Sequence, residues 1–179
     1  MSHYKTNLRD IEFNLFEAYR MQDYLGTGPY ADMDAETARH ILAEVERFST
    51  DVFAESFEEG DRTKIELVDG EVTLPPGIVQ SIKAYYEQGW DTLGRPPALG
   101  GVGAPPSLRW AAQELMVGAN PGAFFFVVGT LMGNVLYEAG TEEQVARFVK
   151  PMLDNAWGST MVLTEADAGS DVGAGTTKA

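Results

Sequence analysis

The chain has 179 residues, of which 44% are hydrophobic and 11% aromatic, and its 13 Lys and Arg against 27 Asp and Glu give a formal net charge of -14. This composition is typical of one globular domain, or of one domain with an extension. The negative charge argues against a nucleic-acid partner, because nucleic-acid affinity comes mainly from cationic side chains. The absence of cysteine excludes disulfides, thiolate metal sites and a cysteine nucleophile. The start of the chain lacks the pattern of a secretory signal, so we expect a cytoplasmic protein.

Two helices are predicted in the first part of the chain. Apolar side chains recur every three or four positions from Leu8 to Tyr19, which predicts a helix that ends near the turn-rich stretch at Gly26. Asp32 or Asp34 can then cap a second helix, because a short polar side chain accepts a hydrogen bond from a first-turn amide. The apolar face of this second helix consists of Ala38, Ile41, Leu42, Val45 and Phe48.

The pattern changes from helix to strand at residues 64–74. Asp69 and Gly70 lie between two short β-prone segments, and this pair is favoured in a two-residue hairpin turn. Two prolines follow, which suit the first turn of a helix that runs to about Gly89. The loop at 89–106 is rich in Gly and Pro but also contains apolar residues, so it forms either a pocket wall or a cover over the core.

Residues 123–139 raise the question of a membrane span. They are apolar on nearly every face, and Gly129 and Gly133 have the GxxxG spacing that can dimerise membrane helices. A span needs about 20 apolar residues, whereas Thr130 and Asn134 interrupt this stretch. We therefore favour a buried core helix over a membrane span, with the glycines allowing close helix contact.

The helices on either side of this stretch have recognisable boundaries. Ser107 can start the helix before it, and Gly140 can end the apolar helix itself. Residues 141–144, TEEQ, then form a capping box for a further helix, in which Pro151 predicts a kink or an interruption. From residue 157 onward the sequence is β-prone again.

Familiar catalytic and metal-binding patterns have little support. His3 lies near the terminus, His40 lies within an amphipathic helix, and Ser170 lacks the GxSxG context of a nucleophile. Adjacent carboxylates such as Glu58 and Glu59 are most simply solvated, and no His or Cys completes a metal site with them. The sequence contains no GxxxxGK[ST] phosphate loop and no strand-borne GxGxxG motif.

The C-terminal stretch has the residue types of a ligand site. A strand that ends at Thr164 would present a hydroxyl and backbone polar groups at its edge. Gly169 would allow backbone amides to approach a large ligand closely, and Ser170 adds a hydroxyl. Such donors suit a heteroaromatic ring and a pyrophosphate. A plain turn after a strand is the alternative.

Residues 161–171, MVLTEADAGSD, resemble the flavin-binding signature of the acyl-CoA dehydrogenases, in which a short apolar run, Thr-Glu and Ala-Gly-Ser-Asp follow in this order. The Gly-rich loop at 89–105 and the GTEEQ helix start at 140–144 are similar to other segments of the family in the same order. Residues 4–57 resemble the extra helical segment of the long-chain members. The resemblance therefore covers nearly the whole chain.

The resemblance implies a mainly α fold: the N-terminal helical domain of the acyl-CoA dehydrogenase fold, with a small β-hairpin and the first strand of the β-domain at its C-terminus. Residues 1–60 would form an N-terminal helical extension and residues 61–156 the helical domain. Residues 157–179 would be the start of a flavin-binding β-domain that is truncated here.

The resemblance also implies a set of cofactor contacts. Thr164 would hydrogen-bond the flavin of FAD near N5 and its pyrimidine edge, and Ser170 would lie near the pyrophosphate and touch the acyl-CoA substrate. Ala166 and Asp167 depart from the Pro and Gly that are common in the family. The residues implied to contact FAD are Met161, Val162, Leu163, Thr164, Gly169 and Ser170.

The implied activity is α,β-dehydrogenation of acyl-CoA thioesters in fatty-acid β-oxidation, with electrons passed to an electron-transfer flavoprotein. The catalytic base of the family is a glutamate outside this chain, and Glu165 belongs to the flavin-side scaffold instead. We therefore expect the chain to be inactive alone, and the full-length protein to be a homo-oligomer. A helical interaction module without FAD and a truncated gene product without function remain alternatives.

Overall fold

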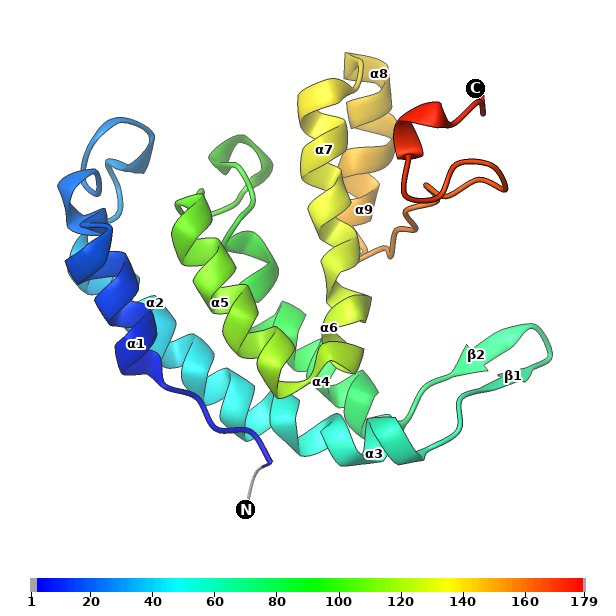
Figure 1. Cartoon of the computed structure of the whole chain (residues 1–179), viewed down its shortest axis with the longest axis horizontal. Helices are drawn as coiled ribbons and strands as arrows, with labels where there is room; N and C mark the ends of the chain where they lie inside the picture. Colours follow the sequence, from blue (N-terminus) through cyan, green and yellow to red (C-terminus); the bar gives the residue numbers. More distant parts are fainter. Residues whose placement is uncertain (1–2, 179) are drawn as a thin grey trace.

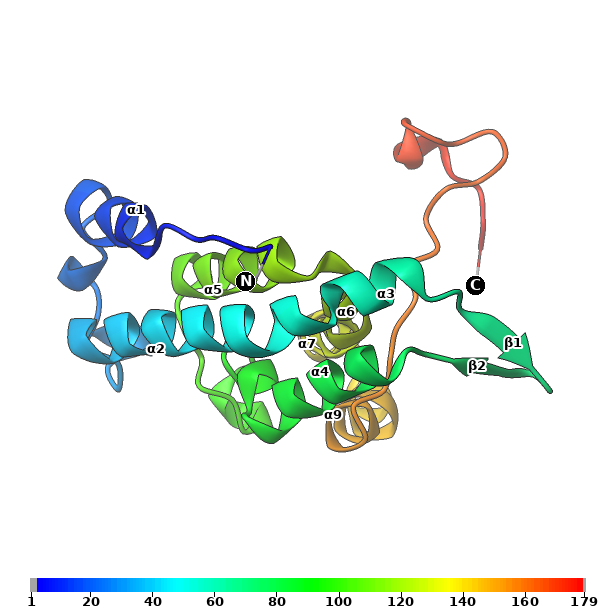
Figure 2. The ribbon, with the colours of Figure 1, turned by 90° about the horizontal axis from the view of Figure 1, so that it is seen from below.

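The computed structural model describes residues 3–178, and most of them lie in helices. The helices pack side by side in one body, as Figure 1 shows. A two-stranded hairpin stands away from this body in both views (Figures 1 and 2), and the segment after the last α-helix stands away from it in Figure 2. These features confirm the prediction of a mainly α fold with a small β-hairpin.

The first helix is shorter than its apolar pattern predicts. Helix α1, Leu8–Glu12, continues as a π-helical turn, Phe13–Ala18, and the helical path stops there rather than near Gly26. Arg20 adopts the left-handed conformation with φ of 51°, and its Nε donates to Asp23 Oδ2 at 2.7 Å. The chain turns at this point because Met21, whose side chain is fully buried, packs into the core.

The second helix, α2, spans Ala35–Phe48, and Asp34 is its cap. Asp34 Oδ1 accepts a hydrogen bond from Thr37 N at 2.7 Å, which satisfies one of the free first-turn amides. The predicted apolar face is confirmed: Ala38, Leu42, Val45 and Phe48 are buried, and Ile41 is partly buried against the core. The helical path then continues through a π-helical turn (Ser49–Phe53) and a 3₁₀ turn (Ala54–Ser56) into α3 (Phe57–Arg62).

The predicted hairpin forms with the predicted turn. Strands β1 (Glu66–Val68) and β2 (Glu71–Thr73) pair antiparallel. Asp69 and Gly70 have φ values of 53° and 86°, so both turn residues are left-handed, as a type I′ turn requires. The side chains of both strands are exposed, and the hairpin therefore contributes no apolar face to the core.

Helices α4 (Pro76–Glu87) and α5 (Pro106–Ala119) complete the centre of the body, with α5 packed against α2. Helix α5 begins at Pro106, because a proline at the first helical position lacks only an N–H that would be unpaired there. The largest fully buried apolar side chains of the core are those of Met21, Leu42, Val45, Phe53, Leu108, Leu115 and Val127.

The loop between α4 and α5 covers the core. Leu93 and Ala104 are buried, and Ala104 N donates to Leu93 O at 2.9 Å across the loop. Asp91 and Arg95 form an ion pair that is nearly buried. Burial raises the pKa of the Asp91 carboxyl, and the nearby Arg95 charge opposes that shift. The loop thus covers the core, and Trp90, Asp91, Leu93 and Gly94 also line a small cavity of about 10 Å³.

The long apolar segment differs from its prediction as one buried helix. It consists of α6 (Pro121–Val127), a 3₁₀ turn (Val128–Thr130) and α7 (Leu131–Ala139). By length and composition Pro121–Ala139 could cross a membrane, which is weak evidence, since core helices of soluble proteins pass the same test. Only 28% of an 18-residue apolar stretch within it is buried, and the side chain of Phe125 is 77% exposed. The core helix that the sequence favours is therefore only partly buried in this chain, since Ala123 and Val127 are buried whereas Phe125 and Phe126 are exposed.

The final helical stretch begins at the predicted capping box, which is confirmed. Gln144 N donates to Thr141 Oγ1 at 3.2 Å, and Thr141 N donates to Gln144 Oε1 at 2.8 Å. Helix α8 (Glu142–Gln144) continues as a π-helical turn (Val145–Val149) and α9 (Lys150–Asp154). The change of helix type lies directly before Pro151, where an interruption was predicted.

Residues 157–164 do not form the strand that their composition and the resemblance predict. They have no regular secondary structure and no ladder partner among residues 3–178. A strand requires a neighbour for its backbone N–H and C=O groups, and the only ladder in the described part of the chain joins β1 to β2. Gly158 passes close to Gly129, where a Cβ would lie 2.7 Å from the Gly158 Cα.

Candidate functional site

The residues predicted to contact the cofactor lie together on one exposed segment after α9 (Figure 2). The side chains of Met161, Val162 and Leu163 are 76%, 86% and 54% exposed, although all three are apolar. Thr164, Gly169 and Ser170 are exposed as well. A Cβ placed on Gly169 would meet no heavy atom within 4 Å, so its backbone is open to a ligand.

A tight turn separates the apolar run from Gly169 and Ser170. Glu165 N donates to Ala168 O at 3.1 Å, and Ala168 N donates to Glu165 O at 3.2 Å. Ala166 and Asp167, the two positions that depart from the common family pattern, lie at the tip of this turn. The departures therefore fall on the turn and leave the exposed Thr164 and Ser170 unchanged.

The side chain of Glu165 joins this turn to the end of the segment. Its carboxylate accepts hydrogen bonds from Thr176 N at 2.9 Å, Thr176 Oγ1 at 3.3 Å and Thr177 N at 2.9 Å. These bonds, led by the one from the Thr176 amide, lower the pKa of the Glu165 carboxyl to about 2. A carboxylate held so firmly in its ionised form is unsuited to accept a proton from a substrate, which agrees with its assignment to the scaffold.

Sequence reasoning missed this contact. The bonded amides come 11 and 12 positions after Glu165, a separation that corresponds to no helical or strand period. Only the acceptor-rich Glu and the two consecutive threonines mark the contact in the sequence, and such residues are common in solvated loops.

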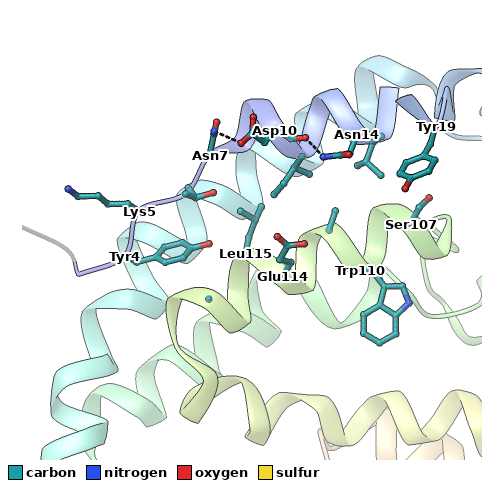
Figure 3. A pocket seen from close by; sticks show the side chains of 15 residues that line it. Tyr4, Lys5, Asn7, Asp10, Asn14, Tyr19, Ser107, Trp110, Glu114 and Leu115 are labelled. Atoms are coloured by element: carbon teal, nitrogen blue, oxygen red, sulfur yellow. Dashed lines mark hydrogen bonds between the residues drawn. The ribbon is translucent and has the colours of Figure 1, made fainter. Parts of the chain in front are cut away.

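A cavity of about 670 Å³ in the helical body is a second place to look for a site. It lies between the N-terminal segment with α1 and the facing helix α5, and Figure 3 shows Tyr4, Asp10, Trp110 and Glu114 around it. Burial raises the pKa of the Tyr4 hydroxyl. Asn7 Nδ2 donates to Asp10 Oδ2 at 2.6 Å, so these two polar side chains partner each other. None of the predicted cofactor contacts lines this cavity.

The histidines are placed apart. His3 Nε2 lies 3.0 Å from Ala119 O, and its ring stacks on Phe57 with centroids 4.2 Å apart. His40 lies on an exposed part of α2, with Nε2 3.9 Å from a carboxylate oxygen of Glu44. Residues 3–178 contain no group of three or more His, Asp or Glu that could hold a metal ion.

The residue types of the exposed segment suit one side of an FAD molecule. The apolar run suits the face of a flavin ring, the Thr164 hydroxyl suits its polar edge, and the open backbone at Gly169 with the Ser170 hydroxyl suits a diphosphate. The residues present therefore fit the cofactor by chemical character.

The fold is a helical domain, and the exposed segment after its last α-helix has the residue types of a ligand-binding segment. The chain belongs to the acyl-CoA dehydrogenase family, because its residues 35–156 match the family model described as the acyl-CoA dehydrogenase N-terminal domain. The resemblance inferred from the sequence motifs is thereby confirmed.

Three curated relatives illustrate the similarity. The chain is 46% identical over its whole length to a broad-specificity linear acyl-CoA dehydrogenase of Mycobacterium tuberculosis, of which it covers 30%. It is 29% identical over 94% of its length to a 3-methylmercaptopropionyl-CoA dehydrogenase of Ruegeria pomeroyi, covering 29%. A butyryl-CoA dehydrogenase of Syntrophomonas wolfei is 29% identical over 99% of the chain, which covers 30% of it. The chain thus spans about 30% of the length of these relatives.

Proposed function

We propose that this chain supplies the helical platform and the first flavin-contacting segment of an FAD-dependent acyl-CoA dehydrogenase of fatty-acid β-oxidation. The observation that carries the proposal is the 46% identity, along the entire chain, to a broad-specificity linear acyl-CoA dehydrogenase. The exposed segment with its signature residues supports it, since burial within the chain does not explain their apolar side chains.

Bound FAD supplies the hydride acceptor for oxidation of the acyl-CoA substrate. Met161, Val162 and Leu163 exclude water from the ring, and the Thr164 hydroxyl and backbone orient its polar edge. Gly169 and Ser170 bind near the diphosphate, where Ser170 also contacts the acyl-CoA.

The remaining steps of the reaction are carried out by parts of full-length family members that this chain does not cover. We place the catalytic base, a glutamate, outside this chain. This chain therefore helps to bind and position FAD, but it does not abstract the proton from the substrate. The proposal includes an electron-transfer flavoprotein as electron acceptor, a homo-oligomeric full-length protein and a cytoplasmic location.

A helical interaction module that lacks FAD is the second candidate function. The exposed apolar side chains of the hairpin, Leu67, Val68 and Val72, favour it, because an unpartnered apolar surface is typical of an interaction site. Flavin absorbance of the purified full-length protein separates the two candidates: a bound flavin supports the dehydrogenase, and its absence supports the module.

The test of the flavin site is Thr164→Val in the full-length protein. We expect weaker FAD retention on gel filtration, or slower flavin reduction by acyl-CoA, because valine keeps the shape of threonine and removes the hydroxyl. Thr73→Val, the same change at an exposed hairpin position, is the matched control and leaves both measurements unchanged. Wild-type behaviour of Thr164→Val in both assays would reject the assigned role.

A further inference from the structure

We propose that Glu165 is a positioning residue for the cofactor: its carboxylate closes residues 165–177 into a loop and so fixes Gly169 and Ser170 for the diphosphate. The identity of the ligand rests on the proposed function. The closure of the loop rests on the hydrogen bonds of this chain alone.

Glu165 acts on both ends of the loop. Its backbone N–H and C=O pair with Ala168 and form the turn immediately before Gly169. Its side chain binds the amides of Thr176 and Thr177 at the far end, each at 2.9 Å. The residues that would contact the diphosphate are therefore bracketed by bonds to one amino acid.

The interior of the loop is compact as well. Ala174 N donates to Asp171 O at 3.1 Å in a short 3₁₀ turn, Val172–Ala174. A Cβ on Gly175 would lie 3.1 Å from Glu165 Oε1. The backbone is therefore already close to the carboxylate at the residue that precedes Thr176 and Thr177. A larger residue at 175 would press on this contact.

Burial provides little support for the loop, so its shape depends on these bonds. Among residues 161–178, only Ala168 is buried. An open segment would have to be ordered when the ligand binds, which costs conformational entropy. A loop that is already closed avoids part of that cost.

The charge of Glu165 would otherwise oppose the proposed ligand. A free carboxylate near a diphosphate is repelled by it. Here both carboxylate oxygens are engaged by N–H donors, which fixes their direction and stabilises the negative charge. The low pKa of Glu165, about 2, agrees with this arrangement.

The experiment compares Glu165→Gln with Asp167→Asn in the full-length protein, with the FAD dissociation constant as the readout. Both changes remove one negative charge from the same turn, but Asp167 has no part in the contact with Thr176 and Thr177. If charge alone mattered, both variants would bind FAD more tightly. Positioning predicts opposite directions: on the order of tenfold weaker binding for Glu165→Gln, and equal or tighter binding for Asp167→Asn.

Amide hydrogen exchange in the cofactor-free protein provides a second readout. We expect Thr176 and Thr177 amides to be protected in the wild type and in Asp167→Asn, and to exchange faster in Glu165→Gln. Because the folded-state pKa is lowered from 4.5 to about 2, the closure is fully stabilised above pH 4.5 and weakens progressively as the pH falls from there toward about 2. Protection factors of the two amides, corrected for the intrinsic exchange rate, should therefore be roughly fourfold lower at pH 4 than at pH 6.

The possible failures are distinct. A full-length protein without FAD would overturn the proposed function. Bound FAD whose affinity does not change in Glu165→Gln would overturn the positioning role and leave the proposed function standing. Unchanged protection of the two threonine amides in Glu165→Gln would overturn the loop closure itself.

Discussion

The core of the helical body, at α2 and α5, and the segment at 157–178 differ in where their apolar side chains lie. In the body, leucines such as Leu42 and Leu108 are fully buried by α2 and α5. In the segment, Met161, Val162 and Leu163 are exposed. Folding of this chain explains the first set and not the second. This difference supports the proposal that the apolar residues of the segment contact a ligand or a neighbouring domain.

The two regions also differ in how their polar groups stabilise them. The body encloses a buried network in which Asn120 Nδ2 donates to Phe53 O at 3.1 Å and to Ser56 Oγ at 2.9 Å. The segment instead relies on the exposed carboxylate of Glu165. Packed side chains shield buried hydrogen bonds from water, whereas water competes for the donors and acceptors of exposed ones. We therefore expect the segment to open more readily than the body.

The largest difference in the free energy of unfolding should come from replacing one leucine by alanine in each region. Leu108→Ala leaves a cavity at a fully buried site and should lower the free energy of unfolding by about 2–5 kcal/mol. Leu163→Ala makes the same chemical change at a side chain that is 54% exposed and should change it by less than about 0.5 kcal/mol. Urea denaturation followed by circular dichroism measures both. Equal losses would show that the segment packs on the body in solution.

A smaller effect is expected from the buried network. Asn120→Ala removes the acceptor for Ala123 N, at 3.0 Å, and the donor for two buried oxygens. The Ala123 amide loses its side-chain acceptor, while Phe53 O and Ser56 Oγ keep their bonds within the Ser56–Ser81 pair. The free energy of unfolding should therefore fall by about 1–3 kcal/mol. Asn155→Ala is the matched control, since Asn155 makes an exposed bond to Pro151 O at 2.8 Å and should have little effect. Denaturation midpoints that coincide for the two variants would contradict the importance of the network.

Features that depend on a few adjacent residues could be predicted from the sequence. The Asp34 cap, the Asp69-Gly70 turn and the Thr141 capping box all appear as expected, because their partners lie within three positions. The family was also predictable, since its signature is contiguous at 161–171. Local chemistry is sufficient in such cases.

Features that depend on distant partners could not be predicted in this way. The first helix ends early because Arg20 turns the chain and Met21 enters a core built from other helices. The burial of Pro121–Ala139 depends on which helices lie beside it, and its composition does not reveal that. The Glu165 contact likewise joins residues 11 and 12 positions apart.

The smallest expected effect tests the boundary of the body at its last helix. Thr141→Ala removes the acceptor for Gln144 N, at 3.2 Å, and leaves a first-turn amide unpaired. The free energy of unfolding should fall by about 1 kcal/mol, and Thr141→Ser, which keeps the hydroxyl, should retain most of it.

Thr176→Ala is the matched change in the exposed segment, because it removes a hydroxyl that bonds Glu165 at 3.3 Å. It should leave global unfolding unchanged, since the segment contributes almost no buried surface. If Thr176→Ala destabilised the chain as much as Thr141→Ala, the loop at 165–177 would have to unfold together with the body. The exposed segment would then be part of the same cooperative unit, and its apolar residues would contribute to the stability of the chain after all.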